Sequence, residues 1–195
     1  MREQDVFVLA DRALERVVQQ IRDDQWEMAL PPEFRRREDG PATLREVINY
    51  HAYDEAWIPD ILAGRTMDEA GKERFDGDVL GAEPKATFRR LVGLGCAAAT
   101  ALDDPERTVH LSYGDYKAHE YLWHANYFRG IRAYEIAKLI GVEPALEPEL
   151  VEALWEELSP HAEEWRAIGV FGPRVEVPDD APLLTRLLAI TGREV

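Results

Sequence analysis

The chain has 195 residues and is 46% hydrophobic, so it is long enough for one domain with a buried core. Its 38 acidic residues outnumber 23 basic ones, and the formal net charge of −15 disfavours nucleic acid and membrane surfaces as partners. One cysteine excludes an internal disulfide and is typical of a reducing compartment. Because no signal-peptide pattern or membrane-spanning apolar run is found, we expect a single cytoplasmic domain over residues 1–195.

Apolar residues recur at helical spacing through the first part of the chain. The first stripe predicts a helix over residues 4–23. Thr43 followed by Glu46 forms a capping-box pattern, which predicts the start of a second helix. The apolar stripe of that helix extends to Leu62. Residues 64–81, rich in Gly and Asp, then form a polar connector.

The second part of the chain predicts further helices and almost no period-two alternation. Pro84 fits the first turn of a third helix, and Asp115 is the expected N-cap of a long fourth helix that Gly141 ends. A fifth helix is expected over residues 148–168 and a short last one over 183–190. Four long amphipathic helices with short to moderate loops indicate an all-α fold, an antiparallel four-helix bundle with extra C-terminal helices.

Several short segments carry a resemblance to one family. They are Leu62–Thr66, Phe75–Gly81, Tyr134–Lys138, Phe171–Pro173 and Leu187–Arg193. These segments resemble the DinB-like superfamily, in particular its mycothiol-dependent maleylpyruvate isomerase-type metal-binding proteins. The resemblance implies a DinB-like four-helix bundle with a pocket between the second and fourth helices.

The resemblance also implies a metal site, and this chain departs from it. Family members commonly bind a divalent metal through a histidine of the second helix and an acid and a histidine four residues apart on the later helix. Some use the metal, zinc or nickel, together with a low-molecular-weight thiol such as mycothiol. His51 keeps the first position, whereas Phe128 stands at the acid position and Arg132 at the histidine position. We therefore expect the metal site to be degenerate, absent or noncanonical, with His51 as its remaining metal ligand.

Glu55 lies one turn after His51 on the same face of the second helix, and Ile58 follows on that face. A histidine and a glutamate at this spacing can orient a ligand or share a proton. The structural alternatives are a buried histidine with one hydrogen-bond partner and a partly solvated glutamate. We predict catalytic roles for His51 and Glu55, and a place for Ile58 in the same interior pocket.

Arg132 is the third predicted catalytic residue. A guanidinium stays charged in nearly any pocket and can bind a carboxylate through two parallel hydrogen bonds. The alternative is a structural salt bridge from Arg132 to Glu55 or Glu135. The two interpretations are compatible if an internal carboxylate pairs with Arg132 until a substrate anion displaces it.

A second acid and histidine pair lies nearby, since Glu120 and His124 are also four residues apart. Because His124 is about 12 Å along the helix from Arg132, it cannot replace the lost ligand, although the pair leaves open an opportunistic metal site. The other expected pocket residues are Trp57, Tyr127, Phe128 and His124. We expect Phe128 to fill the volume of the lost acid, and such a pocket suits a hydrophobic or aromatic molecule with one anionic end.

Together these features favour a small-molecule pocket protein, an isomerase or transferase that acts on an anionic or aromatic molecule. Two alternatives remain open: a metal-dependent thiol transferase or isomerase with other ligands, and a noncatalytic binding or stress-associated bundle. The sequence also leaves open a homodimer. Cys96 lies in a helix rich in Ala and Gly, which indicates a small buried side chain rather than a nucleophile.

Overall fold

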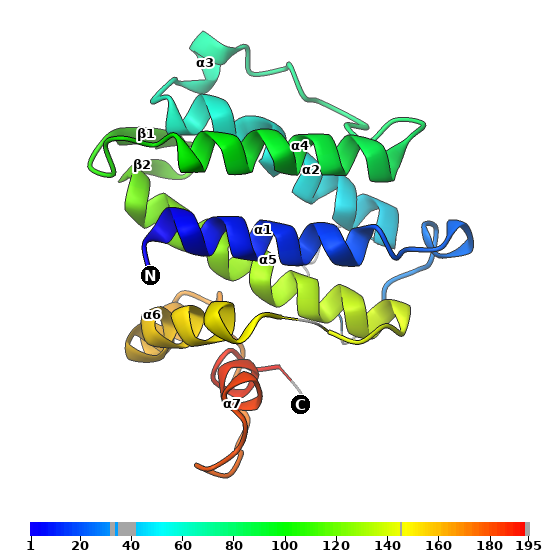
Figure 1. Cartoon of the computed structure of the whole chain (residues 1–195), viewed down its shortest axis with the longest axis vertical. Coiled ribbons are helices and arrows are strands. Elements are labelled where there is room, and N and C mark those ends of the chain that lie inside the picture. The colour runs from blue at the N-terminus through cyan, green and yellow to red at the C-terminus, as the bar shows by residue number, and fades with distance from the viewer. Residues whose placement is uncertain (32–33, 35–41, 145, 194–195) are drawn as a thin grey trace. The chain divides into compact units, whose positions relative to one another are not determined.

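The computed structural model describes residues 1–31, 34, 42–144 and 146–193, and these residues are mostly helical. The all-α class is confirmed, with one small two-stranded sheet in addition. The chain divides into two compact units, one of which comprises Arg2–Pro144, while the other holds the last two helices (Figure 1). The prediction of a single domain over residues 1–195 stays a prediction.

Four long helices build the Arg2–Pro144 unit: α1 (Glu3–Val18), α2 (Leu44–Leu62), α4 (Pro84–Thr100) and α5 (Ala118–Ile140). Helix α1 packs against both α4 and α5, and α2 packs against α4 (Figure 1). Two single turns, η1 (Asp23–Gln25) and α3 (Met67–Ala70), lie in the connections. Part of the core is a cluster that includes Phe7, Ile58, Leu62, Leu102, Tyr121 and Leu122.

The ends of these helices follow the local sequence signals. Thr43 caps α2, where its hydroxyl accepts a hydrogen bond from the backbone N–H of Glu46 at 3.3 Å. The Glu46 carboxylate in turn accepts the N–H of Thr43 at 3.1 Å, so the predicted capping box is confirmed. Pro84 is the first residue of α4, and Gly141 ends α5 with a φ of 74°, as expected.

Two predicted boundaries are wrong. Helix α1 ends at Val18 rather than near residue 23. Asp115 does not cap a helix but lies in a hairpin of β1 (Thr108–Leu111) and β2 (Gly114–Lys117), where it faces His110 across the strands. Helix α5 starts after Lys117, whose backbone N–H donates to the Glu120 carboxylate at 2.8 Å. The hairpin escaped prediction because each strand has only four residues, too few for a clear period-two pattern.

The connector after α2 is fastened to that helix. Asn49 accepts the backbone N–H of Val79 at 2.8 Å, and buried Asp60 pairs with Arg74 at 3.1 Å and with Arg65. The Trp57 ring packs edge-on against Phe75 at 5.0 Å between ring centroids. Trp57, expected in the pocket, is therefore buried under the connector.

The second unit contains α6 (Pro148–Ala167) and α7 (Leu183–Ile190), which pack against each other and match the two predicted helices. Arg166 of α6 donates hydrogen bonds to the backbone oxygens of Gly172 and of Ile190, the latter at 3.0 Å. The Trp165 and Phe171 rings stack at 5.6 Å. Gly192 approaches the backbone of Gly172 so closely that a Cβ at Gly192 would lie 2.6 Å from it.

Candidate functional site

Three charged side chains from α1, α2 and α5 meet inside the Arg2–Pro144 unit, and we call Asp11, Glu55 and Arg129 the triad. Arg129 Nε lies 2.6 Å from Asp11 Oδ1, and Arg129 Nη2 lies 2.5 Å from Glu55 Oε1. The two acidic side chains are fully buried, and that of Arg129 is 4% exposed. Glu55 therefore pairs with Arg129. The expected alternative of a salt bridge between Arg132 and Glu55 is wrong.

The triad contains two carboxyl groups for one guanidinium. Burial, and then the nearby charge of Glu55, raise the pKa of Asp11 well above its usual range. Burial opposes the charge of Arg129, but Glu55 and Asp11 outweigh it and raise the Arg129 pKa. A proton on Asp11 leaves one carboxylate against one guanidinium, which makes the triad electrically neutral in a place where net charge is costly.

Helix α4 leaves room for the triad at Gly95. A Cβ at this position would lie 2.7 Å from Glu55 Oε2 and 3.5 Å from Asp11 Oδ2. The Cys96 sulfur lies 3.8 Å from Asp11 Oδ2. A side chain at position 95 would thus compete with the Glu55 carboxylate for the same space.

His51, one turn before Glu55, is only 4% exposed. Its ring lies edge-on to Tyr50 at 6.1 Å, and within the described part of the chain no residue gives it a hydrogen bond. Burial, and then the positive charges of Arg132 and Arg129, lower the His51 pKa well below 6.5. The imidazole is therefore uncharged at neutral pH.

Arg132 lies on the His51 side of α5. Its Nη1 atom is 2.8 Å from Glu135 Oε2, and its guanidinium lies over the Phe34 ring at 4.7 Å. Its side chain is 18% exposed, so it does not extend into bulk solvent. The expected alternative of a pair with Glu135 is confirmed, and the charge of Arg132 still acts on His51. We call His51, Arg132 and Glu135 the His51 site.

Aromatic side chains lie beside the His51 site in an arrangement different from the expected one. Tyr127 is buried, and Ile58 is fully buried as expected. Phe128 is 48% exposed, so the expectation that it fills interior volume is wrong. Phe128 follows buried Tyr127 on α5, so its ring faces outward. The centroids of the Tyr127 and Phe128 rings are 5.1 Å apart. His124 is half-buried and packs against Tyr116 of the hairpin at 5.2 Å.

The expectation of a degenerate metal site at His51 stays a prediction. Among the described residues, no three His, Cys, Asp or Glu side chains come together as a metal-binding group. The charges that act on His51 are the guanidiniums of Arg132 and Arg129, which repel a cation. Glu120 caps the start of α5, and His124 contacts the Tyr113 hydroxyl at 3.5 Å.

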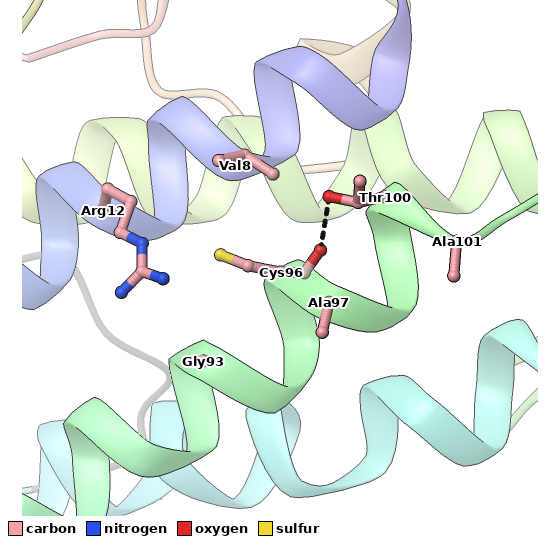
Figure 2. Close-up of a pocket in the computed structure, with 7 residues that line it drawn as sticks. All are labelled: Val8, Arg12, Gly93, Cys96, Ala97, Thr100 and Ala101. Atoms are coloured by element: carbon pink, nitrogen blue, oxygen red, sulfur yellow. Dashed lines mark hydrogen bonds between the residues drawn. The ribbon is translucent and has the colours of Figure 1, made fainter.

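A shallow hollow of about 510 Å³ lies between α1 and α4 on the outside of this unit (Figure 2). It is lined by Val8, Arg12, Gly93, Cys96, Ala97, Thr100 and Ala101. Burial, with the charge of Asp11, raises the pKa of Cys96 to about 12, so the thiol is protonated and a poor nucleophile at neutral pH. The expected structural role of Cys96 agrees with its burial.

Comparisons with protein-family models, with curated proteins and with solved structures give no match for this chain. The resemblance to DinB-like proteins accordingly stays a prediction that rests on the residues quoted above. None of the described helices is both long and apolar enough to cross a membrane.

Of the three triad residues only Glu55 was predicted, because Asp11 and Arg129 were not among the expected site residues. A signal was present in the sequence. Asp11 follows buried Ala10 on the apolar face of α1, and Arg129 lies four residues from both Ala125 and Ala133, which are buried. A charged residue on an apolar helix face indicates a buried partner of opposite charge.

Proposed function

We propose that the Arg2–Pro144 unit is an antiparallel four-helix bundle of the DinB-like type, and that its His51 site binds a small anionic or aromatic molecule. The protein would act on that molecule as an isomerase or transferase, without the metal site of the family. The resemblance of the sequence supports the class of reaction, and the packing of α1, α2, α4 and α5 is compatible with such a bundle.

One observation carries the proposal: His51 is buried, uncharged and without a hydrogen bond to any described residue, beside the charge of Arg132. A buried imidazole normally has a hydrogen-bond partner, and its absence within the described residues leaves its nitrogens to a ligand. An uncharged imidazole can accept a proton from a bound molecule and return it at another atom, as a proton-shift isomerisation requires.

Arg132 would bind the anionic end of that molecule. In this structure its guanidinium is paired with Glu135 at 2.8 Å. A carboxylate ligand would take the place of Glu135, which returns when the ligand leaves. A guanidinium stabilises negative charge on a ligand oxygen, but it does not generate a metal-bound hydroxide or thiolate. This favours proton transfer or thiol addition from a separate low-molecular-weight thiol.

Binding of benzoate and maleate tests the proposal, with the ring nitrogens of His51 followed by NMR. We expect both anions to shift the His51 signals, and Arg132→Gln to abolish the effect. Arg12→Gln is the matched control, since Arg12 forms an ion pair at 2.6 Å with Glu15, which is three residues further along its helix, as Glu135 is from Arg132. Equal losses in the two variants, or no shift at all in the natural protein, would refute anion binding at Arg132.

Turnover and metal content separate the rival functions. Isomerisation of maleate is assayed with and without a low-molecular-weight thiol, and the purified protein is analysed for metal. We expect well under one transition-metal ion per chain. Stoichiometric zinc or nickel bound through His51 would favour the metal-dependent transferase, and anion binding without turnover of such substrates would favour a noncatalytic binding protein.

A further inference from the structure

The hairpin and α2 form an aromatic surface next to the His51 site. Tyr113, in the hairpin turn, is 59% exposed, and Tyr50 of α2 is 53% exposed. The Tyr113 ring lies 5.5 Å from that of Tyr116 and 6.2 Å from that of His124. Strand β1 packs against α2, and Tyr50 also lies edge-on to His51. More than half of each of these two tyrosines, Tyr50 and Tyr113, is thus exposed beside the hairpin and α2.

The acidic residue Asp54 of α2 acts on this surface through its charge, which adds to the effect of burial and raises the pKa of Tyr113 and of Tyr121, whereas the next residue, Glu55, is bound in the triad. Asp54 lies four residues after Tyr50, on the same helix face, and its side chain is half-buried. Within the described residues Asp54 has neither a hydrogen bond nor an ion pair. The charge of Arg129 acts on Asp54, but Arg129 is already paired with Asp11 and Glu55. A half-buried carboxylate without an ion pair of its own is costly, and a cation bound there would reduce that cost.

We propose that Asp54 and the rings of Tyr50 and Tyr113 bind an alkylated ammonium group, so that the ligand of the His51 site is a zwitterion. The zwitterionic class rests on the anion binding proposed for Arg132, whereas the ammonium subsite stands on its own residues. Alkylated ammonium groups bind the faces of tyrosine rings, because the π electrons attract the cation. The net charge of −15 also raises the local concentration of cations.

The spacing suits a small molecule. His51 and Asp54 are three residues apart on α2, which corresponds to about 4.5 Å along a helix axis. Arg132 and Arg129 both act on His51, and Arg129 also acts on Asp54, so the anion site and the ammonium subsite lie in the same part of the bundle. The ligand class that would reach both is a carboxylic acid with a di- or trimethylated amine.

Choline and its uncharged isostere 3,3-dimethyl-1-butanol test the subsite in the full-length protein by calorimetry and NMR. We expect choline to bind and the alcohol not to bind, because the two have the same shape and differ in charge. Asp54→Asn should weaken choline binding about tenfold. The control Asp24→Asn, which removes an exposed carboxylate of η1, should leave the affinity unchanged.

The rings and the pH dependence give independent readouts. Tyr113→Leu should weaken choline binding, whereas Tyr113→Phe, which keeps the ring, should not. Burial raises the pKa of Asp54 to about 6, with Arg129 lowering it and Glu55 raising it, and the Asp54 charge also acts on Tyr113 and Tyr121. Choline affinity should therefore rise as the pH increases through about 6, and this rise should be absent in Asp54→Asn.

The outcomes distinguish this proposal from the proposed function. Equal binding of choline and its isostere, or equal affinities of Asp54→Asn and Asp24→Asn for choline, would overturn the ammonium subsite even if benzoate binds at Arg132. Choline binding that persists in Arg132→Gln, in a protein that binds no benzoate, would support the subsite and refute the anion site. Circular dichroism of each variant verifies that it is folded.

Discussion

The triad and the His51 site differ in how their charged and polar groups are partnered. In the triad, Arg129 lies within 2.6 Å of both Asp11 and Glu55, and none of the three side chains is more than 4% exposed. In the His51 site, the imidazole has no hydrogen bond to a described residue, and Arg132 forms an ion pair with Glu135, one turn further along its own helix. Under the proposed function, the enclosed charges of the triad serve structure, and the charge of Arg132 serves a ligand.

Removal of each arginine is the strongest way to break this comparison. Arg129→Met leaves two buried carboxyl groups without a cation and should lower the free energy of unfolding by about 3–5 kcal/mol. Arg132→Met breaks a pair between residues three apart on one helix and should cost about 1 kcal/mol or less. Urea denaturation at pH 7, followed by circular dichroism, measures both. Similar losses would mean that the two arginines do not differ in role.

Ile58→Ala tests the apolar wall of the triad. Ile58 is fully buried, and its Cβ lies 3.7 Å from the position that a Cβ of Gly95 would occupy. Truncation should lower the free energy of unfolding by about 2–5 kcal/mol, because it removes buried methyl groups and leaves a cavity. Benzoate binding at the His51 site should not change, since Ile58 belongs to the core beside the triad. A loss below about 1 kcal/mol would contradict this burial.

The long helices could be predicted from the sequence because their signals are local. The capping box of Thr43 and Glu46, Pro84 at the start of α4, and Gly141 at the end of α5 each act within one turn. The hairpin could not be predicted, because its pairing of Thr108 with Lys117 depends on packing against α2 and α5.

Only the residues of the candidate site that share one face of α2 were predicted from the sequence. His51, Glu55 and Ile58 share the buried side of α2, as their spacing indicates. The partner of Glu55 could not be deduced from the sequence. Arg129 and Arg132 are three residues apart on α5, and the rotation of α5 about its axis decides which of them meets Glu55. A Cβ contact from Gly95, 40 residues away along the chain, also carries no sequence signal.

Gly95→Ala introduces a steric clash in the triad and not in the His51 site, and so tests the two regions separately. The new Cβ would lie 2.7 Å from Glu55 Oε2, and the carboxylate cannot move away without weakening its pair with Arg129. We expect a loss of about 1–3 kcal/mol relative to Gly93→Ala. Gly93 lies on the same helix with nothing within 4 Å of its added Cβ, so Gly93→Ala should stabilise by up to about 1 kcal/mol. Equal thermal stability of the two variants would show that the space beside the Glu55 carboxylate can hold a methyl group.

Asp11→Asn gives the clearest test of the proton in the triad, because its expected effect depends on pH. Burial and Glu55 raise the Asp11 pKa in the folded protein above its value of 3.8 in the unfolded chain. As the pH rises past about 4, the unfolded chain releases this proton while the folded protein keeps it, so the contribution of Asp11 to stability falls until the pH reaches the folded pKa.

Asparagine has the shape of the protonated acid and no proton to lose. The stability of Asp11→Asn relative to the natural protein should therefore improve steadily between pH 5 and pH 9 on the order of 1 kcal/mol per pH unit, or until the folded pKa is passed. The control Asp5→Asn removes an exposed carboxylate of the same helix, and the pH slope of Asp11→Asn is compared with that of this variant. Parallel curves for the natural protein and Asp11→Asn would show that Asp11 is ionised, and the triad would then carry a net negative charge. Such a charge would place the electrostatic cost in the enclosed region and remove the distinction between the triad and the His51 site.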